Sequence, residues 1–367
     1  MNFVTLYPLV SNTELVKDVG QIPYSLMKYY GFNSTYVSFY LDKKGKNVQY
    51  TQGLKLKKIP MIFNNRLGVF FSEVKYLLFN SRNIDWLNLY HLDRENGYLI
   101  LIYKFLNPQG HVYLKLDIDF KGCKMYQKNL KWRNTLKFVT SKADLVTSES
   151  KSVRNIIQKY TKKNIKILNN GYIEQKIDIN QFEKQNIFIT AARLGTRQKD
   201  TATLLEAFAK SSEKHNWKLE LIGSSTHEFN IYMNKFYSRF PQLKDRVILK
   251  GEINHKIDLY REYAKAKVFI LDSLWEGAPL VLPEALRQGC SFILSDQIPS
   301  ANEITNNGKY GQIIKAHDID ALSQALLKAT KTNVYLKDDI EKRINYAKKY
   351  FTWKNISKQL YKYLKEY

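Results

Sequence analysis

The residues best suited to chemistry lie in the segment LWEGAPLVLPEAL, residues 274–286, which holds Glu276 and, eight positions later, Glu284. The four residues after Glu276 are Gly277, Ala278, Pro279 and Leu280. The strand-like run VFILDS precedes this segment and a helical pattern, residues 281–288, follows, so Glu276 is expected at the carboxyl edge of a sheet, where open α/β sheets bind ligands. Backbone N–H groups at a helix start favour an anion such as a diphosphate. Glu284 would accept hydrogen bonds from two vicinal hydroxyls. An isolated pair of glutamates is explained by the helix dipole alone, but the strand, glycine and proline context favours a site.

A second candidate is the segment ARLGTRQKD, residues 192–200, which follows the strand-like run IFITA. Arg193 ends that run, and Lys199 precedes a helical pattern over residues 201–210. Two cations at a sheet edge would clamp a diphosphate and neutralise the charge that develops as it leaves. The alternative is a solvated basic loop, which is the interpretation we give to Arg197.

Weaker signals are glycines at strand ends. Gly223 and Gly251, the latter followed by Ile253, would let the backbone approach a ligand closely, although such glycines often mark plain turns. Gly20 lies between the first strand and a helical pattern over residues 22–30. No G-x-G-x-x-G motif follows the first strand, which disfavours a dinucleotide redox cofactor.

His91 and Asp117 each follow a strand-like run in the first half of the chain, so both are expected at the carboxyl edge of one sheet. For either residue alone, a structural role is the more common interpretation. Asp117 and Asp119 would share a face if the strand continued, but no third ligand is evident nearby. We therefore expect no metal site and no cofactor other than a donor substrate.

These segments must be positioned by a regular framework. Apolar runs rich in β-branched and aromatic residues alternate with helix-length segments, which predicts parallel α/β layers with sheets buried on both faces. The predicted strands are residues 3–10, 35–40, 86–90, 112–116, 145–147, 187–191, 218–222, 247–250, 268–271, 291–294 and 311–314. Two such sets of similar length predict two doubly wound domains, with a boundary near residues 169–171. Residues 338–367 predict two helices, or one helix bent near residues 351–353.

Composition restricts the function classes. The 367-residue chain is 44% hydrophobic, enough for packed cores, and carries 58 Lys and Arg against 34 Asp and Glu, a net charge of +24. Residues 1–170 carry +16 of this charge, which indicates an anionic partner such as nucleic acid, a membrane surface or a phosphorylated substrate.

The two cysteines, Cys123 and Cys290, exclude a disulfide framework. We expect a cytoplasmic protein without a signal peptide or membrane-spanning helix.

A basic stretch, residues 120–138, interleaves aromatic side chains with six cations. This composition suits an anionic membrane surface or a nucleic acid, and a solvated helix face is the plain alternative.

Taken together, these residues resemble glycosyltransferase family 4, retaining transferases of the GT-B fold. The family's E-x7-E signature is matched by Glu276, Gly277, Pro279, Leu280, Leu282, Glu284 and Ala285. Its R-L…K pattern is matched by Arg193, Leu194 and Lys199, and its N-G domain boundary by Asn170 and Gly171. The A-D-x-V-x-x-x-S pattern before that boundary is also present, at residues 143–150. In the first half the likeness is looser and is closest to bacterial members that build surface polysaccharides. There Val19-Gly20 stands for the usual Gly-Gly, and Leu116-Asp117 for the usual His-Asp.

The resemblance implies two Rossmann-like parallel-sheet domains facing a cleft. The two domains are an acceptor-side domain over residues 1–168 and a nucleotide-sugar domain over residues 172–345. A final helix over residues 346–367 would cross back to the first domain. Arg193 and Lys199 would bind the diphosphate, and Glu276 with the amides after it would hold the sugar and phosphate. Gly251 and Ile253 would approach the base and Glu284 the ribose. Gly20 and His91 would face the donor from the first domain.

The implied function is retaining, metal-independent transfer of a sugar from a nucleotide diphosphate sugar. The donor would be a UDP-hexose or UDP-N-acetylhexosamine, and the acceptor a hydroxyl of a lipid-linked or growing surface glycan. The enzyme would work at the cytoplasmic membrane face, which it would reach through its basic first domain. The alternatives are a non-catalytic GT-B subunit that supports another transferase, a basic nucleic-acid-binding protein, and, as a weaker option, an epimerase on the same fold.

Overall fold

The computed structural model divides the chain into two compact units. The N-terminal unit holds residues 1–173 and 351–367, and the C-terminal unit holds residues 174–350. The structure describes residues 1–8, 11–42, 44–45, 47–331 and 337–367.

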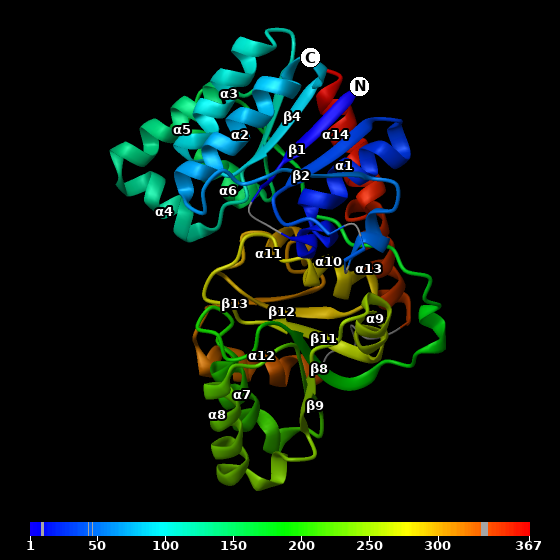
Figure 1. Ribbon diagram of the computed structural model, residues 1–367. Coiled ribbons are helices and arrows are strands. Elements are labelled where there is room, and N and C mark those ends of the chain that lie inside the picture. The colour runs from blue at the N-terminus through cyan, green and yellow to red at the C-terminus, as the bar shows by residue number, and fades with distance from the viewer. Residues whose placement is uncertain (9–10, 43, 46, 332–336) are drawn as a thin grey trace. The chain divides into compact units, whose positions relative to one another are not determined.

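The N-terminal unit is built on a seven-stranded sheet in which all neighbouring strands run parallel (Figure 1). Its strands are β1 (Asn2–Leu6), β2 (Asn33–Ser38), β3 (Lys55–Lys58), β4 (Trp86–Tyr90), β5 (His111–Lys115), β6 (Leu145–Ser148) and β7 (Ile165–Ile167). Their spatial order is β3-β2-β1-β4-β5-β6-β7, so the winding direction reverses between β1 and β4. At such a reversal the connections diverge and leave a crevice beyond the carboxyl ends of the two strands.

Helices cover this sheet. They are α1 (Asp18–Tyr30), α2 (Arg66–Asn80), α3 (Arg94–Leu106), α4 (Phe120–Lys128), α5 (Leu130–Lys142), α6 (Lys151–Ile157) and α14 (Trp353–Leu364). Short 3₁₀ turns are η1 (Asn12–Val16), η2 (Val48–Thr51), η3 (Ser81–Asn83) and η4 (Gln158–Tyr160). Helix α14 joins this unit although it ends the chain, because Ile356, Leu360 and Leu364 form one buried stripe. It packs on α1, where the Tyr30 and Tyr361 rings stack with centroids 4.4 Å apart.

The C-terminal unit repeats this plan with a six-stranded parallel sheet. Its strands are β8 (Gln185–Ala191), β9 (Lys218–Ile222), β10 (Val247–Gly251), β11 (Ala266–Leu271), β12 (Ser291–Ser295) and β13 (Gly311–Ile314). The order β10-β9-β8-β11-β12-β13 reverses between β8 and β11. The helices are α7 (Thr201–Ser211), α8 (His227–Arg239), α9 (Lys256–Lys265), α10 (Val281–Arg287), α11 (Ala301–Ile304), α12 (Ile319–Thr330) and α13 (Lys337–Tyr350), with turns η5 (Ile179–Gln181), η6 (Ser212–Lys214) and η7 (Pro241–Leu243).

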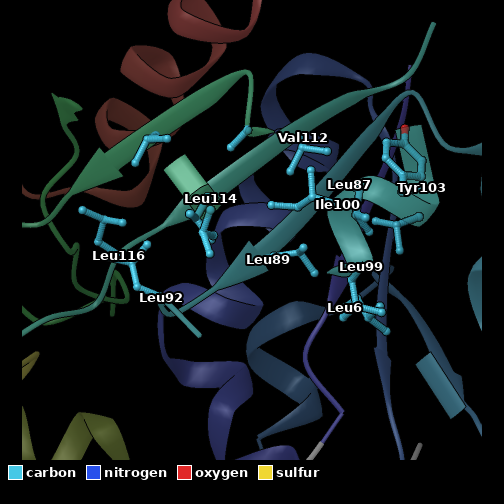
Figure 2. Close-up of a cluster of buried hydrophobic side chains, with 14 of the residues drawn as sticks. Leu6, Leu87, Leu89, Leu92, Leu99, Ile100, Tyr103, Val112, Leu114 and Leu116 are labelled. Carbon is cyan, nitrogen blue, oxygen red and sulfur yellow. The ribbon is translucent and has the colours of Figure 1, made fainter. Parts of the chain in front are cut away.

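Each unit has its own hydrophobic core. In the N-terminal unit, Leu87 and Leu89 of β4 pack with Leu99 and Ile100 of α3 (Figure 2). All five residues of β4 are buried, on both faces of the sheet, which explains why its sequence is nearly continuous in apolar residues. Burying one such leucine contributes about 1.5–3 kcal/mol, so these layers fix the strands whose ends carry the site.

The α/β class with two Rossmann-like parallel-sheet units is confirmed. The strands predicted at residues 86–90, 218–222 and 311–314 have the predicted bounds. The strand predicted at residues 3–10 ends at Leu6, and residues 9 and 10 lie outside the described part of the chain.

Several predicted elements need correction. The helix predicted from residue 22 begins at Asp18, because η1 turns the chain directly into it. Strand β3, sequence KLKK, was missed because an exposed edge strand lacks an apolar pattern. At the carboxyl terminus the two-helix alternative is right. Residues 346–350 complete α13 in the C-terminal unit, and α14 begins at Trp353.

Candidate functional site

The segment after β8 carries both predicted cations. The chain leaves Ala191 through a turn in which Lys199 N donates to Thr196 O at 3.0 Å. This turn presents Arg193 as an exposed side chain and Lys199 as a largely buried one, with 13% of its side chain exposed. The next helix, α7, begins at Thr201, as predicted. Both cations therefore follow the same strand, but Arg193 is exposed and Lys199 is largely buried.

The segment after β11 lies against this turn. Leu274 N donates to Gln198 O at 2.8 Å, and the Gln198 amide nitrogen donates to Trp275 O at 2.9 Å. The Lys199 ammonium group forms an ion pair with the buried Glu276 carboxylate. Strands β8 and β11 are neighbours at the reversal of the sheet, so their following segments meet at the crevice that this topology creates.

Gln198, which the sequence analysis did not single out, joins the predicted residues. Its amide oxygen accepts a hydrogen bond from Arg193 at 2.9 Å, and its amide nitrogen lies 3.4 Å from Glu276 Oε2. The only available signal was its position between Arg193 and Lys199. The structure therefore brings Arg193, Lys199 and Glu276 into one polar network, with Gln198 at its centre.

The charges in this network are not equivalent. The charge of Lys199 is balanced by Glu276, whereas Arg193 has the neutral amide of Gln198 as its hydrogen-bond partner. An exposed guanidinium with a neutral partner keeps its full attraction for an anion. In this arrangement Arg193 is exposed to an anionic ligand, whereas Lys199 is paired with the carboxylate of Glu276.

Glu284 lies on α10 and is paired with Lys256, the first residue of α9. Glu284 is 1% exposed, and its Oε2 atom is buried without a hydrogen-bond partner. Lys256 was not predicted from the sequence, because a lysine opening an amphipathic helix has no distinguishing pattern. One carboxylate oxygen of Glu284 is thus satisfied within the protein, and the other is buried without a hydrogen-bond partner.

The strand-end glycines predicted at the site lie together. Gly223 N donates to Gly251 O at 2.8 Å, and a Cβ atom on Gly223 would lie 1.8 Å from Ala192 O. With φ at +132°, no other residue type fits Gly223 without moving the end of β8. A Cβ on Gly251 would meet open space, and Ile253 is half-buried just beyond it.

The residues after Glu276 form a half-buried loop into α10, which runs from Val281 to Arg287. They are the predicted Gly277, Ala278, Pro279 and Leu280. The helix ends one residue earlier than expected because Gln288 and Gly289 terminate it, with Gly289 at a φ of +78°.

Asp272, directly after β11, was not singled out. It is 3% exposed, and neither carboxylate oxygen has a hydrogen-bond partner. Burial, reinforced by Asp200, raises the pKa of Asp272 to about 7. Asp200 in turn pairs with His317 at 2.7 Å.

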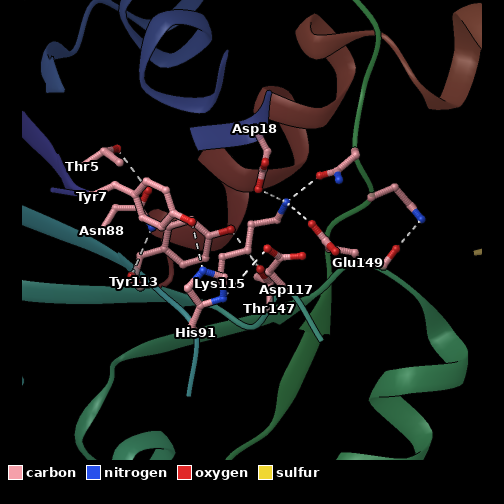
Figure 3. A network of polar contacts seen from close by, with 12 residues as sticks. Thr5, Tyr7, Asp18, Asn88, His91, Tyr113, Lys115, Asp117, Thr147 and Glu149 are labelled. Atoms are coloured by element: carbon pink, nitrogen blue, oxygen red, sulfur yellow. Dashed lines mark hydrogen bonds and ion pairs between the residues drawn. The ribbon is translucent and has the colours of Figure 1, made fainter. Parts of the chain in front are cut away.

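The remaining predicted residues lie in the N-terminal unit. His91 Nε2 is 3.0 Å from the Tyr7 hydroxyl, and its Nδ1 is 3.9 Å from Asp117 (Figure 3). Gly20 lies in the first turn of α1, where a Cβ would come within 2.5 Å of Leu15 Cα. Close helix packing on Leu15 therefore explains this glycine without a ligand.

Beside Asp117, a buried network surrounds Lys115 (Figure 3). Its ammonium group donates to Asp18 at 2.5 Å, Glu149 at 2.7 Å and Asn170 at 2.6 Å. Burial opposes the charge, but Asp18 and Glu149 outweigh it and raise the pKa of Lys115. The sequence signal was a single lysine inside the apolar run VYLKL.

No helix in the described residues combines the length and apolar character that a bilayer crossing requires. Across the same described ranges, His, Cys, Asp and Glu side chains do not gather in groups of three or more that would hold a metal ion.

Comparisons with known proteins agree with this architecture. Residues 172–350 match the family model described as "Glycosyl transferases group 1". A Campylobacter jejuni protein named N-acetylgalactosamine-N,N'-diacetylbacillosaminyl-diphospho-undecaprenol 4-alpha-N-acetylgalactosaminyltransferase is 26% identical, over 55% of this chain and 56% of that protein. An Escherichia coli UDP-Gal:alpha-D-GlcNAc-diphosphoundecaprenol alpha-1,3-galactosyltransferase is 36% identical over 27% of this chain and 24% of that protein. The chain thus spans about half the length, or less, of these curated relatives.

Among solved structures, Anabaena Alr3699/HepE in complex with UDP has a TM-score of 0.74 at 14% identity and covers all of both chains. At that identity the likeness shows the fold, and it confirms the predicted GT-B class.

Proposed function

We propose that this protein is a glycosyltransferase that moves a sugar from a nucleotide diphosphate sugar to a hydroxyl group of a glycan. The observation that carries the proposal is the network of Arg193, Gln198, Lys199 and Glu276 at the strand reversal of the second sheet. It supplies an exposed cation for a diphosphate and a carboxylate beside it. The curated relatives are named as transferases acting on undecaprenol-linked sugars, which supports a lipid-linked acceptor.

The chemistry proposed is retaining and independent of a metal ion. The bond between the sugar's anomeric carbon and the diphosphate oxygen breaks, and its electron pair leaves with the diphosphate. Arg193 and Lys199 stabilise that developing charge. The acceptor hydroxyl attacks from the same face and passes its proton to the departing phosphate oxygen, so the anomeric configuration is kept. The sequence resemblance is the source of this stereochemistry.

The other donor contacts follow from the geometry of the C-terminal unit. The free Oε2 of Glu284 would accept a hydrogen bond from a ribose hydroxyl, while Lys256 keeps the other oxygen occupied. Gly251 and Ile253 would lie along the base, and Gly223 would allow close backbone approach. The loop after Glu276 would lie against the sugar and phosphate of the donor, through Gly277, Ala278, Pro279 and Leu280. We keep Gly20 and His91 as donor contacts from the N-terminal unit, the former on the resemblance alone.

Peripheral attachment to an anionic membrane is part of the proposal. In the basic stretch, the start of α5 exposes Leu130 and Trp132 among lysines. Helices α2 and α3 of the same unit expose further large apolar side chains, namely Leu67, Phe71, Leu78, Phe79, Tyr98, Leu101 and Phe105. Apolar side chains flanked by cations suit the interface of an anionic bilayer.

The deciding experiment screens nucleotide sugars for hydrolysis and for thermal stabilisation of the full chain. We expect one UDP-hexose or UDP-N-acetylhexosamine to raise the melting temperature and to be hydrolysed slowly without an acceptor. If no nucleotide sugar stabilises the protein or is consumed, the enzyme proposal fails and a non-catalytic GT-B subunit takes its place. With an acceptor in hand, NMR of the product's anomeric proton tests retention.

A further inference from the structure

A surface pocket of about 610 Å³ lies in the N-terminal unit, between the end of α5 and the segment that precedes β7. Its lining comes from three residues in the last turns of α5 and from residues 159–163. These two segments lead into the amino ends of β6 and β7. Because the sheet is parallel throughout, this pocket and the carboxyl ends of β1 and β4 lie at opposite edges of the sheet.

Positive charge is concentrated in this pocket, which we call the lysine pocket. Among the described residues its lining contains neither Asp nor Glu, but it contains the four lysines Lys137, Lys159, Lys162 and Lys163. In the part of the chain that the structure describes, none of the four belongs to an ion pair. Like charges gathered at one place repel one another, and an anion bound among them replaces that repulsion by attraction.

Lys163 is the lysine whose charge these surroundings affect. It is half-buried, and burial lowers its pKa; the nearby Asp144 opposes this shift and Lys104 adds to it. The charged form of Lys163 is therefore less stable than that of a solvated lysine, and an anion in the pocket would stabilise it.

Lys162 and Lys163 are carried by a turn that is held from two sides. The hydroxyl groups of Thr161 and of the buried Thr140 of α5 share a hydrogen bond of 2.7 Å, and Thr161 Oγ1 accepts from Lys163 N at 3.1 Å. From the other side, the Gln158 amide nitrogen donates to Lys163 O at 3.0 Å. The two lysine side chains therefore extend from a fixed backbone, which reduces the ordering that binding a ligand requires.

The plain alternative is that the lysines only balance the ends of helices. Helix α5 and the 3₁₀ turn η4 both end beside the pocket, and the carboxyl end of a helix carries about half a negative charge. Two such ends amount to about one negative charge against four lysines, so a surplus of about three positive charges remains. Balancing the helix ends therefore does not account for the charge of this pocket.

Two aromatic side chains, Phe138 and Tyr160, are also part of the lining, and both are half-buried. The Arg133 guanidinium lies 4.8 Å from the centroid of the Tyr160 ring and helps to hold it. An aromatic wall beside cations suits an anionic group that is attached to a carbon skeleton. Among such groups a phosphomonoester brings about two negative charges and three acceptor oxygens, which several ammonium groups can share.

We propose that the lysine pocket binds a phosphomonoester group on a larger ligand, at a site separate from the Arg193–Glu276 network of the other unit. This inference goes beyond the proposed sugar transfer and does not depend on it. A soluble phosphorylated metabolite and the headgroup of phosphatidic acid both offer this group, and the experiment distinguishes these two sources.

The test uses the full chain and two probes. Calorimetric titration with glycerol 3-phosphate measures binding of the soluble group. Sedimentation with phosphatidylcholine vesicles that contain phosphatidic acid measures binding of the headgroup, and phosphatidylglycerol vesicles of equal surface charge are the control. We expect either one glycerol 3-phosphate bound per chain, which identifies a soluble ligand, or a preference for phosphatidic acid over phosphatidylglycerol, which identifies the headgroup.

Lys159→Gln combined with Lys162→Gln should weaken binding of that probe about tenfold, the scale of two exposed charge contacts. The matched control is Lys55→Gln combined with Lys58→Gln, which removes two exposed lysines of β3 in the same unit and should leave binding unchanged. Ser141→Trp fills the pocket while keeping every lysine, so it should also weaken binding.

Arg193→Ala separates this site from the donor site, since it should leave binding of the probe unchanged. Binding of neither probe, or equal effects of the two double variants, would overturn the proposal. Loss of binding in Arg193→Ala alone would place the phosphate in the other unit and would also overturn it. Stronger binding of a single-stranded oligonucleotide without a terminal phosphate than of glycerol 3-phosphate would assign the pocket to nucleic acid instead.

Discussion

Lys199 and Glu276 form an ion pair across 77 positions of sequence, at the ends of two neighbouring strands. In this ion pair Glu276 neutralises the charge of Lys199, which is one of the two cations proposed to hold a diphosphate. A diphosphate that reaches this site would draw Lys199 away from Glu276 and leave the carboxylate free for sugar hydroxyls. Donor binding and carboxylate release would then be coupled at one pair of side chains.

The first prediction concerns the cationic pair. Arg193→Ala and Lys199→Ala should each lower turnover by about 10²–10³-fold, because each removes a group that stabilises charge on the leaving diphosphate. Steady-state kinetics with the donor identified by screening is the measurement. Arg197→Ala, an exposed arginine in the same loop, is the matched control and should keep wild-type turnover. Wild-type rates in both test variants would exclude the clamp.

The second prediction separates stability from binding at Glu284. Lys256→Met should destabilise the protein by about 3 kcal/mol, since it leaves a buried carboxylate unpaired. Adding Glu284→Gln should restore most of that loss by removing the stranded charge. Urea unfolding of the three variants gives the comparison, and an additive double variant would show that the pair is not coupled. Glu284→Gln alone should raise the KM for the donor.

The third prediction concerns pH and Asp272, whose pKa is raised in the folded protein to about 7. The folded state binds this proton more tightly than the unfolded state, so stability falls as pH rises from about 4 to about 7. The single group contributes at most about 1.4 kcal/mol per pH unit. The neighbouring charges are Asp200, His317, Asp296 and Asp318.

Asp272→Asn removes the titration at nearly constant volume. Its unfolding free energy should decline less between pH 5 and pH 7 than that of the wild type. Denaturant unfolding at several pH values measures the difference, and parallel curves for the two proteins would show that Asp272 ionises normally.

The fourth prediction concerns the membrane. The protein should bind vesicles containing anionic phospholipid at low salt and dissociate as salt rises, because the attraction is screened. Leu130→Ser with Trp132→Ser should weaken binding while leaving the salt dependence in place. Vesicle sedimentation is the assay, with zwitterionic vesicles as the control. Absence of binding to anionic vesicles at low salt would identify the basic stretch as solvated surface.

The fifth prediction concerns metal ions. Activity should survive EDTA, because Arg193 and Lys199 are proposed to take the role that a divalent cation has in other transferases. A loss of activity that Mg²⁺ restores would contradict this assignment.

The sequence by itself determined the layers and the segments that are proposed to carry the chemistry. Strand positions such as β4 and β12 follow from apolar runs that only a doubly covered sheet can bury, and the loops after β8 and β11 follow from where such runs stop. Apolar runs and the points where they stop are local patterns, so they can be recognised in the sequence without knowing what packs against each strand. Strand β3 and the role of Gln198 were not predicted, because neither shows an apolar pattern in the sequence.

Only the tertiary structure decided which groups meet. The pairing of Lys199 with Glu276 and of Lys256 with Glu284 depends on side chains brought within a few ångströms from distant segments. Electrostatic and hydrogen-bond energies change steeply over such distances, and a linear sequence does not contain those distances.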